Sequence, residues 1–420
     1  MKTFTIKTLG CKVNQYESQA MREIFEKNGY VLSDDKSADI VVINSCTVTG
    51  TADAKTRKII KKIRKDNPSA EIVLSGCLAV IEEDIAKFRK MPEIVRVVPN
   101  DRKFDFCDLV GTGSASGDTS QYHFQKISRF DSHTRAFCQI QTGCDQACTY
   151  CKVHLVRGRS ESRSSLDITN EVNKLIGAGY REIVITGICV GSWKGESDLS
   201  LAGLLKLIAS STTDSRIRLS SIEPNHVTEE LIEVISSGGE RICQHLHIPL
   251  QSGCDKTLRS MNRRYTSGEY ENLISRIRLK TPHVGITTDV ICGFPGESDE
   301  SYKKTVETIQ RIKPSRLHVF KYSDREGTPS FEMTPKVPSR IAEERVSKLI
   351  EIGKQLECDF AAQFSGNQVK ILVESEIKDG LCSGYTSQYA EVLLEGFQDQ
   401  IGRFVDIRPI MRSNKLYACR

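Results

Sequence analysis

Hydrophobic and polar positions alternate between two periods along the first 110 residues. Three short, β-rich apolar runs each lead through a polar turn into a stretch with helical periodicity. Strand–helix units that repeat in this way predict a parallel sheet covered by helices, so we expect residues 1–110 to form a doubly wound α/β domain. The expected strands cover residues 4–9, 39–44 and 71–75, and the expected helices cover about 15–28, 51–66 and 81–90.

A longer series of strands and helices follows a polar connector. Residues 111–132 begin with ten Gly, Ser, Thr, Ala and Asp residues and read as a flexible linker. Residues 133–362 predict six parallel strands with crossover helices, and a final helix over 339–362 that braces them. We expect an open, partial (β/α)6 barrel, whose active site lies at the carboxyl ends of the strands. The expected strands are 136–141, 182–187, 217–222, 245–250, 285–292 and 316–322, and the helices are 167–179, 199–210, 227–237, 267–279 and 298–312.

The last segment, residues 365–420, alternates short apolar runs with glycine. Such a pattern predicts a small antiparallel β-barrel. The segment carries seven Lys and Arg residues and seven Asp and Glu residues, so it has no basic bias. The expected strands are 368–373, 380–386, 390–394 and 404–409.

Composition sets broad limits. At 420 residues the chain is long enough for two or three domains, and its net charge of +5 permits a nucleic-acid partner without requiring one. The first residues lack the apolar core of a signal peptide, and no apolar run could span a membrane. We therefore expect a cytoplasmic protein whose fifteen cysteines are reduced, so that clustered cysteines indicate metal rather than disulfides.

One short loop carries the clearest chemical signal. Cys144, Cys148 and Cys151 have the spacing C-x3-C-x2-C directly after an expected strand. Thiolates select iron–sulfur clusters, zinc or Cu(I), and a 4Fe-4S cluster normally takes four of them. Three thiolates leave one iron free to hold a substrate or cofactor, as catalytic zinc sites do with their open position. A zinc knuckle, or scattered structural cysteines, is the alternative, although only His154 follows at a finger-like spacing.

A second set of three cysteines follows the first three strands. Cys11, Cys46 and Cys77 each come directly after an expected strand of the amino-terminal sheet. Because the carboxyl ends of parallel strands share one edge of the sheet, these thiols are expected to meet there and bind a shared metal. Cysteine is also among the most buried residue types, so three core thiols are the alternative.

Other polar residues follow strands of the expected barrel. Gly187 would let backbone approach a ligand closely, and Glu223 could accept a hydrogen bond from a ribose hydroxyl. Glycine and proline after a strand also have the simpler explanation of turn chemistry, and His247 that of a hydrogen-bonded packing residue. The helix at 51–66 has a basic face that either grips phosphates or is merely solvated.

Together these features resemble the radical S-adenosylmethionine (SAM) methylthiotransferase family over nearly the whole chain. The resemblance is carried by both cysteine sets, Arg157-Gly-Arg159 and the segments HIPLQSGCDKTLRSMNRR at 247–264, DVICGFPGE at 289–297 and HVFKYSDREGT at 318–328. It implies that each cysteine set binds a 4Fe-4S cluster and that SAM lies against the strand ends, with Gly187 and Glu223 as contacts. Lys152, His154 and Cys189 depart from the family pattern.

The resemblance also implies the chemistry. SAM is cleaved at the Cys144 loop to a 5′-deoxyadenosyl radical, which abstracts hydrogen from the target carbon; the second cluster presents sulfur and a further SAM supplies the methyl group. No side chain has a pKa that would let it remove an aromatic hydrogen, so we nominate no catalytic acid or base. A low-potential electron donor is implied, and we expect a monomer.

The expected substrate comes from the residues around Cys11. The segment Thr8-Leu-Gly-Cys11-Lys-Val-Asn14-Gln-Tyr-Glu17-Ser resembles the branch that makes the 2-methylthio derivative of N6-threonylcarbamoyladenosine at position 37 of tRNA. The partner would be the anticodon loop, and residues 365–420 resemble the RNA-binding, OB-like TRAM domain, with a simple capping barrel as the alternative. Candidates for contacts to RNA, which could instead pair with nearby acids, are Arg157, Arg159, Arg263 and Arg264.

Four other functions remain open at this stage. Within the family, the substrate could be isopentenyladenosine in tRNA or an aspartate of a ribosomal protein. In other classes, the chain could be a two-cluster electron carrier or a zinc-bound RNA-binding scaffold. An electron carrier would be expected to hold complete sets of four cysteines, whereas both sets here stop at three.

Overall fold

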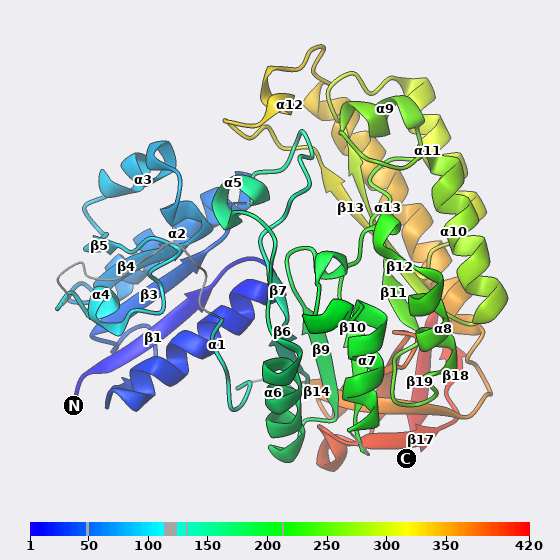
Figure 1. Ribbon diagram of the computed structural model, residues 1–420, viewed down its shortest axis with the longest axis horizontal. Helices are drawn as coiled ribbons and strands as arrows, with labels where there is room; N and C mark the ends of the chain where they lie inside the picture. The colour runs from blue at the N-terminus through cyan, green and yellow to red at the C-terminus, as the bar shows by residue number, and fades with distance from the viewer. Residues whose placement is uncertain (48–49, 113–123, 132, 212–213) are drawn as a thin grey trace.

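Three units succeed one another along the chain and pack together. A computed structural model describes residues 1–47, 50–112, 124–131, 133–211 and 214–420. In Figure 1 the amino-terminal unit, in blue, lies beside the central unit, and the carboxyl-terminal sheet, in orange and red, lies beneath the central strands. Most of the predicted linker, at 113–123 and 132, falls outside the described residues.

The amino-terminal unit is a five-stranded parallel sheet in the order β2-β1-β3-β4-β5. This is one of the two common doubly wound orders, and the chain reverses direction across the sheet between β1 and β3. The three predicted strands and their helices are confirmed, within a few residues. The elements are β1 (Thr3–Thr8), α1 (Lys12–Lys27), β2 (Val31–Leu32), β3 (Ile40–Ser45), α2 (Gly50–Asp66), β4 (Glu71–Gly76), α3 (Glu82–Arg89), β5 (Arg96–Val97) and α4 (Phe106–Val110).

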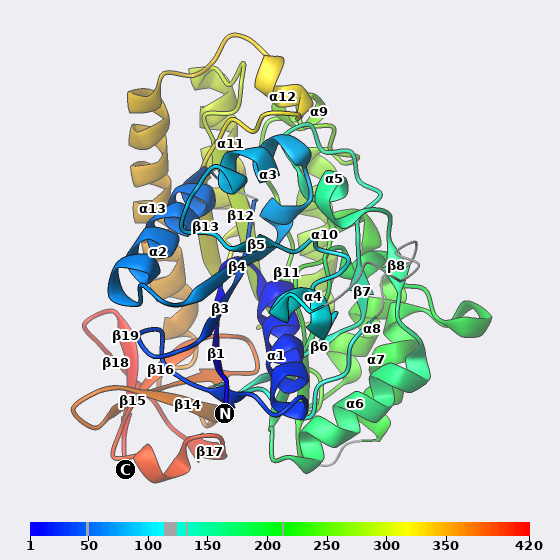
Figure 2. The ribbon, with the colours of Figure 1, turned by 90° about the vertical axis from the view of Figure 1, so that its left-hand side faces the viewer.

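Helices cover both faces of this sheet because its strands are apolar on both sides. Val41 and Ile43 of β3 pack with Ile60 of α2 and Phe88 of α3. Their neighbours in the strand pack on the opposite face, in a cluster with Phe25 of α1. In both views α1 lies between this sheet and the central unit (Figures 1 and 2).

The central unit contains two three-stranded parallel sheets, β10-β9-β6 and β11-β12-β13. Parallel bridges from Ile217 to Ile242 and from Ser221 to His247 join them. The strands therefore follow one another in sequence order, as the alternation predicted. The elements are β6 (Ala136–Gln139), β7 (Gln141–Thr142), α5 (Val153–Arg157), β8 (Glu161–Ser162), α6 (Ser165–Gly177), β9 (Glu182–Thr186), α7 (Leu201–Ser210), β10 (Arg216–Leu219), α8 (Glu229–Ser237), β11 (His245–His247), α9 (Asp255–Ser260), α10 (Ser267–Lys280), β12 (Gly285–Cys292), α11 (Asp299–Ile312), β13 (Arg316–Lys321), α12 (Pro329–Glu332) and α13 (Ser339–Ala362).

Three predicted strands of the central unit end at least two residues earlier than expected. The strand expected at 136–141 ends at Gln139, and Gln141 then pairs with the antiparallel β8. The strand expected at 217–222 ends at Leu219, and the strand expected at 245–250 ends at His247. Pro249 explains the early end at His247, because proline has no N–H to donate to a neighbouring strand.

The starts of the central helices are fixed by side chains. Five of them begin after a serine or threonine whose hydroxyl accepts a hydrogen bond from the third amide of the helix. Each such cap contributes about 1 kcal/mol to helix stability. The caps are Ser164, Ser200, Thr228, Thr266 and Ser298.

The carboxyl-terminal sheet has six strands in the order β17-β14-β15-β16-β19-β18. Four of its five pairings are antiparallel, but β16 and β19 are parallel, which corrects the expectation of a purely antiparallel sheet. The prediction missed β18 and β19, although Ser413 and Asn414 between them both have positive φ, as a tight hairpin turn requires. The elements are β14 (Val369–Lys378), β15 (Leu381–Thr386), β16 (Glu391–Glu395), β17 (Phe404–Ile407), β18 (Ile410–Arg412) and β19 (Lys415–Cys419).

The loop between β15 and β16 closes the amino-terminal end of the central strands. The Arg218 guanidinium donates to the main-chain oxygens of Thr386 and Ser387, at 3.2 and 3.0 Å. Tyr389 of the same loop lies 4.9 Å from the ring of His245, measured between ring centroids. The opposite end, where the cysteine loop follows β6, carries no part of this sheet in the described structure.

Candidate functional site

The first cysteine set lies where the sheet order predicts a ligand site. Cys11 and Cys46 follow β1 and β3, the two strands at the reversal point, and Cys77 follows β4. Gly10, with φ +112°, allows the close approach, since a Cβ there would lie 2.8 Å from Cys46 Cβ. Cys11 also caps the amino terminus of α1, where the helix dipole favours an anionic sulfur.

Buried cations face this set. Arg157, from the central unit, lies close enough to Cys11 and Cys77 to interact with their charge. Burial raises the pKa of the Cys11 thiol, and Arg157 partly offsets that rise. Burial likewise lowers the pKa of Lys103 to about 8, against the opposing effect of Glu17. Buried positive charge of this kind is what a set of anionic thiolates requires.

The second set occupies a loop braced by the segment before α10. The Thr149 hydroxyl donates to the main-chain oxygen of Ser260 at 2.8 Å, and the Asn262 amide donates to that of Ala147 at 2.8 Å. Gly143 opens the loop with φ +71°, and a Cβ there would lie 1.7 Å from the main-chain oxygen of Arg159. A larger residue at 143 would displace the loop.

Each sulfur of this loop accepts a hydrogen bond. The main-chain N–H of Gln146 donates to Cys144 Sγ and that of Val153 to Cys151 Sγ, both at 3.4 Å. Arg263 Nη1 donates to Cys148 Sγ at 3.2 Å. Donors aimed at sulfur stabilise thiolates and are the means by which proteins tune iron–sulfur clusters. This donor set fits a 4Fe-4S cluster.

A fourth thiol, Cys189, lies beside this loop and was not predicted to contribute to it. It follows β9, is buried, and hydrogen-bonds through its side chain to Cys144. That hydrogen bond, more than any other influence, lowers the pKa of Cys144 to about 7. Gln141 Oε1 fixes the main chain here by accepting from the Cys189 N–H at 2.7 Å.

Ion pairs and a hydrogen bond join the two units next to both cysteine sets. Lys152, next to Cys151, lies 2.9 Å from Asp84 Oδ2 in α3, the helix that follows Cys77. Arg325 donates to Thr47 Oγ1, next to Cys46, at 2.7 Å and to Asp53 at 2.9 Å. A residue next to each set is thus bonded across the boundary between the units.

The structure separates the four candidate arginines into two kinds. Arg157 is buried and bonded to Glu17 and Asn14, and Arg263 is buried against Cys148 and paired with Glu223. Neither therefore presents its guanidinium to solvent, and the alternative of pairing with nearby acids applies to both. Arg159 and Arg264 are exposed.

The two predicted SAM contacts lie near the Cys144 loop. Glu223 reaches it through Arg263, which touches both Glu223 and Cys148. Gly187 adjoins Gln141, since a Cβ at 187 would lie 2.9 Å from Gln141 Oε1. The glycine is therefore also required for packing.

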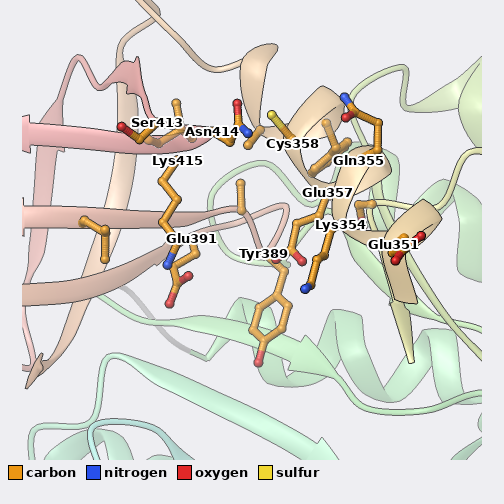
Figure 3. Close-up of a pocket in the computed structure, with 16 residues that line it drawn as sticks. Glu351, Lys354, Gln355, Glu357, Cys358, Tyr389, Glu391, Ser413, Asn414 and Lys415 are labelled. Carbon is orange, nitrogen blue, oxygen red and sulfur yellow. The ribbon is translucent and has the colours of Figure 1, made fainter. Parts of the chain in front are cut away.

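One cleft among the described residues lies away from both cysteine sets. It separates α13 from the carboxyl-terminal sheet and is lined by charged residues of both signs, including Glu357, Lys354 and Lys415 (Figure 3). Tyr389 also lines it. No cysteine of either set lines it, so the site is identified by donor chemistry rather than by the depth of a cleft.

Sequence comparisons identify the family, and structure comparisons concern the fold. The profile described as "Uncharacterized protein family UPF0004" matches residues 3–98, and that of the radical SAM superfamily matches residues 138–309. Threonylcarbamoyladenosine tRNA methylthiotransferase MtaB of Thermotoga maritima is 35% identical over 97% of this chain and 94% of its own length. The Bacillus subtilis protein of the same name is also 35% identical, with the same coverage.

The chain belongs to the radical SAM methylthiotransferase family. A second group of relatives includes the tRNA-2-methylthio-N(6)-dimethylallyladenosine synthase of Carboxydothermus hydrogenoformans, 33% identical over 97% of this chain and 96% of that protein. Among solved structures, the radical SAM methyltransferase TsrM of Kitasatospora setae superposes with a TM-score of 0.57 at 16% identity, covering 79% of this chain and 77% of that chain. That likeness concerns the fold.

Two departures of this methylthiotransferase from the family pattern have structural roles. Lys152 ties the Cys144 loop to α3, and Cys189 donates a hydrogen bond to Cys144. The segment around Cys11 that resembles one substrate branch is largely internal: Asn14, Tyr16 and Glu17 are buried, and each bonds to another segment of the chain. Among the described residues, no helix is both long and apolar enough to cross a membrane.

Proposed function

We propose that this methylthiotransferase converts N6-threonylcarbamoyladenosine at position 37 of tRNA into its 2-methylthio derivative. The observation that supports this most directly is that residues next to both three-cysteine sets, Thr47 beside Cys46 and Lys152 beside Cys151, are bonded across the boundary between the two units. A reaction that inserts sulfur at a carbon needs a radical source and a sulfur source within reach of the same atom, and proximity of this kind contributes a large part of the rate.

Cys144, Cys148 and Cys151 would hold the 4Fe-4S cluster that binds SAM, and Cys11, Cys46 and Cys77 would hold a second. Such clusters supply, when bound, the electron that cleaves SAM to a radical and the position from which sulfur is transferred. The chain's own residues supply the thiolates, the hydrogen bonds to their sulfurs and the buried cations Arg157 and Lys103. Three thiolates in each set leave one iron without a protein ligand.

Glu223 and Gly187 are the proposed contacts to SAM. Arg263 holds the Glu223 carboxylate beside Cys148, where it would accept a hydrogen bond from the ribose of SAM bound at the same cluster. Gly187, at the end of β9, keeps side-chain atoms away from that position. Arg263 is then a positioning residue for both.

The proposed partner is the anticodon loop of tRNA, and Arg159 and Arg264 are the proposed contacts to its phosphates. Both are exposed, and each closely follows a buried arginine that touches a cysteine set or its immediate surroundings. They therefore border the site without belonging to its interior. Arginine suits phosphate because its planar guanidinium donates two parallel hydrogen bonds.

We also propose that the central strands form an open (β/α)6 barrel and that residues 365–420 form a TRAM-like module. Strands in sequence order, joined by two bridges, support the first assignment. A mostly antiparallel six-stranded sheet supports the second. We further propose that the enzyme is monomeric and cytoplasmic and receives electrons from a low-potential donor.

Two measurements test the function. Anaerobic reconstitution with iron and sulfide should give about eight irons per chain, falling to about four when Cys148 or Cys46 is replaced by alanine. Cys358→Ala, in α13, is the matched control and should keep about eight. A colourless protein with tightly bound zinc would instead identify a zinc-bound scaffold.

The second measurement is mass spectrometry of digested tRNA. Reconstituted protein with SAM and a reductant should add a methylthio group to threonylcarbamoyladenosine in tRNA from a strain that lacks the gene. Modification of isopentenyladenosine, or of a ribosomal-protein aspartate, would assign the chain to a sibling branch. Eight irons without SAM cleavage or any product would identify an electron carrier.

A further inference from the structure

A row of polar side chains crosses the inner face of β11, β12 and β13. It comprises two residues of β11, two of β12 and one of β13: His245, His247, Thr287, Asp289 and His318. Strand register places His247 beside Thr287, and Asp289 beside His318. The flanking residues Leu317 and Val319 pack toward the core, so His318 faces the other way.

Four contacts connect these side chains into one continuous row. His245 Nε2 lies 3.1 Å and His247 Nδ1 2.8 Å from Thr287 Oγ1. His247 Nε2 lies 3.1 Å from Asp289 Oδ2, and His318 Nδ1 lies 3.1 Å from Asp289 Oδ1. The row therefore runs from the buried His245 to His318, whose side chain is 43% exposed.

The positions of the protons follow from what each atom can donate. Burial would raise the pKa of Asp289, but the hydrogen bonds from His247 and His318 lower it below its ordinary value, so the carboxylate is ionised and only accepts. The protons in both contacts to Asp289 must then come from the imidazoles. In its neutral form His247 carries its proton on Nε2, and its Nδ1 accepts a hydrogen bond from the Thr287 hydroxyl.

The other hydrogen bonds of the row follow in the same way. The Thr287 hydroxyl donates a hydrogen bond to His247, and its oxygen accepts a hydrogen bond from His245 Nε2–H. Burial lowers the pKa of His245 well below its ordinary value, so this ring is neutral. Its Nδ1 is then a bare acceptor, in agreement with the lack of any partner for that atom among the described residues. At the other end, Nδ1 of a neutral His318 holds the proton, and Nε2 keeps a free lone pair.

A divalent cation is the competing explanation for two imidazoles and a carboxylate. The three candidate ligand atoms lie within 4.8 Å of one another. Hydrogen bonds account for every N–H and O–H proton between His245 and His318 without a cation, however, and each of the two contacts to Asp289 uses a different oxygen. The free atom at the end of the row is therefore a hydrogen-bond acceptor rather than a metal ligand.

The row lies on strands of the central unit whose carboxyl ends lead toward the amino-terminal unit. β13, which carries His318, leads seven residues later to Arg325, whose guanidinium touches Thr47 beside Cys46. In parallel β/α barrels the active site lies at the carboxyl ends of the strands, so a base that enters there can meet the inner face of β13. A flipped base is commonly read through hydrogen bonds to its Watson–Crick edge.

We propose that His318 is a base-contacting residue, whose Nε2, oriented by Asp289, accepts a hydrogen bond from the N6–H of the target adenosine. The proposal rests on the proposed function and deepens it. Asp289, His247 and Thr287 are positioning residues, which fix the tautomer of His318 from the interior. SAM also carries an adenine N6–H, so the test separates the two sources.

The test uses reconstituted full-length protein and an anticodon stem-loop carrying N6-threonylcarbamoyladenosine. His318→Ala should weaken stem-loop binding about tenfold, equal to ~1.4 kcal/mol. SAM affinity and iron content should not change. His318→Gln, which can offer an acceptor oxygen, should recover part of the loss. A stem-loop with a methyl group in place of the N6 hydrogen should bind wild type about tenfold more weakly and bind His318→Ala no more weakly than the unmethylated one.

A matched pair at the far end of the row tests the orientation. Thr287→Val removes the hydroxyl at constant shape, and Thr287→Ser retains it. Nitrogen-15 NMR of the His318 ring should show the proton on Nδ1 in wild type and Thr287→Ser, and a mixture of tautomers in Thr287→Val. A role confined to packing would leave the tautomer unchanged.

Three results would overturn the proposal. They are equal stem-loop affinity of wild type and His318→Ala, loss of SAM affinity without loss of stem-loop affinity, and a stoichiometric divalent metal that disappears in His247→Ala. Each is distinct from failure of the proposed function, which would appear as wild-type protein that does not modify threonylcarbamoyladenosine at all.

Discussion

Arg157 and Glu17 form a buried ion pair that joins the central unit to the amino-terminal unit, with Arg157 Nη2 3.0 Å from Glu17 Oε2. Lys103 lies 2.6 Å from the same carboxylate. Burial alone would raise the pKa of Glu17, but the charges of Arg157 and Lys103 outweigh it and lower the pKa to about 2. The pair therefore acts on stability and on the position of the cations beside Cys11 and Cys77.

Replacing Glu17 by Gln should lower the free energy of unfolding by about 3–5 kcal/mol, because it leaves two buried cations without a counter-charge. Urea denaturation at pH 7 measures this. Since the folded-state pKa is depressed, the wild-type advantage is present above about pH 4.5 and is lost as the pH falls toward 2. Glu82→Gln, which breaks an exposed pair with Arg89, is the control and should cost at most about 0.5 kcal/mol.

Removing the Cys189 thiol should make Cys144 less reactive in the iron-free protein. The hydrogen bond from Cys189 is the main reason that the pKa of Cys144 is about 7. In Cys189→Ala the pKa should rise toward its ordinary value, so the thiolate fraction at pH 7 falls from about half to a few per cent. Alkylation by iodoacetamide, followed by peptide mass spectrometry, should slow about tenfold at pH 7 and converge with wild type near pH 10. Equal rates at pH 7 would show that the two thiols do not interact.

Arg263 should raise the reduction potential of a cluster held by Cys148. Its guanidinium donates to Cys148 Sγ, and a cation beside sulfur stabilises the more negative, reduced state. Arg263→Met should lower the midpoint potential by about 60 mV, a tenfold change in a one-electron equilibrium. Redox titration followed by electron paramagnetic resonance measures it. The exposed neighbour provides the control, Arg264→Met, and a potential unchanged in both variants would contradict the assignment.

Two glutamates at the base of the central strands should differ in their effect on stability. Glu182 is fully buried and lies 2.6 Å from both Arg216 Nε and Arg218 Nε. Burial instead raises the pKa of Glu374 to about 7, despite the opposing charge of Arg135. Glu182→Gln should therefore cost about 3–5 kcal/mol. Glu374→Gln replaces a half-protonated group and should cost less than about 1 kcal/mol at pH 7. Thermal and urea unfolding of both variants would reveal equal losses if the two carboxyls carried the same charge.

The sequence was informative where periodicity decides the outcome. Alternating strands and helices locate the ends of parallel strands, and these ends predict that Cys11, Cys46 and Cys77 lie at one edge of a sheet. Contacts between the units could not be predicted. Glu17 and Arg157, for example, are 140 residues apart, and the local sequence around one does not identify the other as its partner. Arg157 and Arg263 were for this reason assigned to RNA, although they are buried.

The row from His245 to His318 was missed for a related reason. Its members belong to three strands, and their contacts depend on the register of β11, β12 and β13, which sequence periodicity does not fix. His247 was accordingly interpreted as a packing residue. Pro249 was a usable signal for the shortness of β11, as the missing N–H ends the ladder.

The loop between β15 and β16 binds two arginines of β10 through its main-chain oxygens. Arg216 and Arg218 donate to the carbonyl oxygens of Tyr385, Thr386 and Ser387. Every amino acid carries such an oxygen, so these three hydrogen bonds do not depend on which side chains stand at 385–387, whereas the ring of Tyr389 contacts His245 directly. A designer could accordingly exchange this tail for that of a distant homologue and expect a folded hybrid, provided that the path of the loop and Tyr389 are kept.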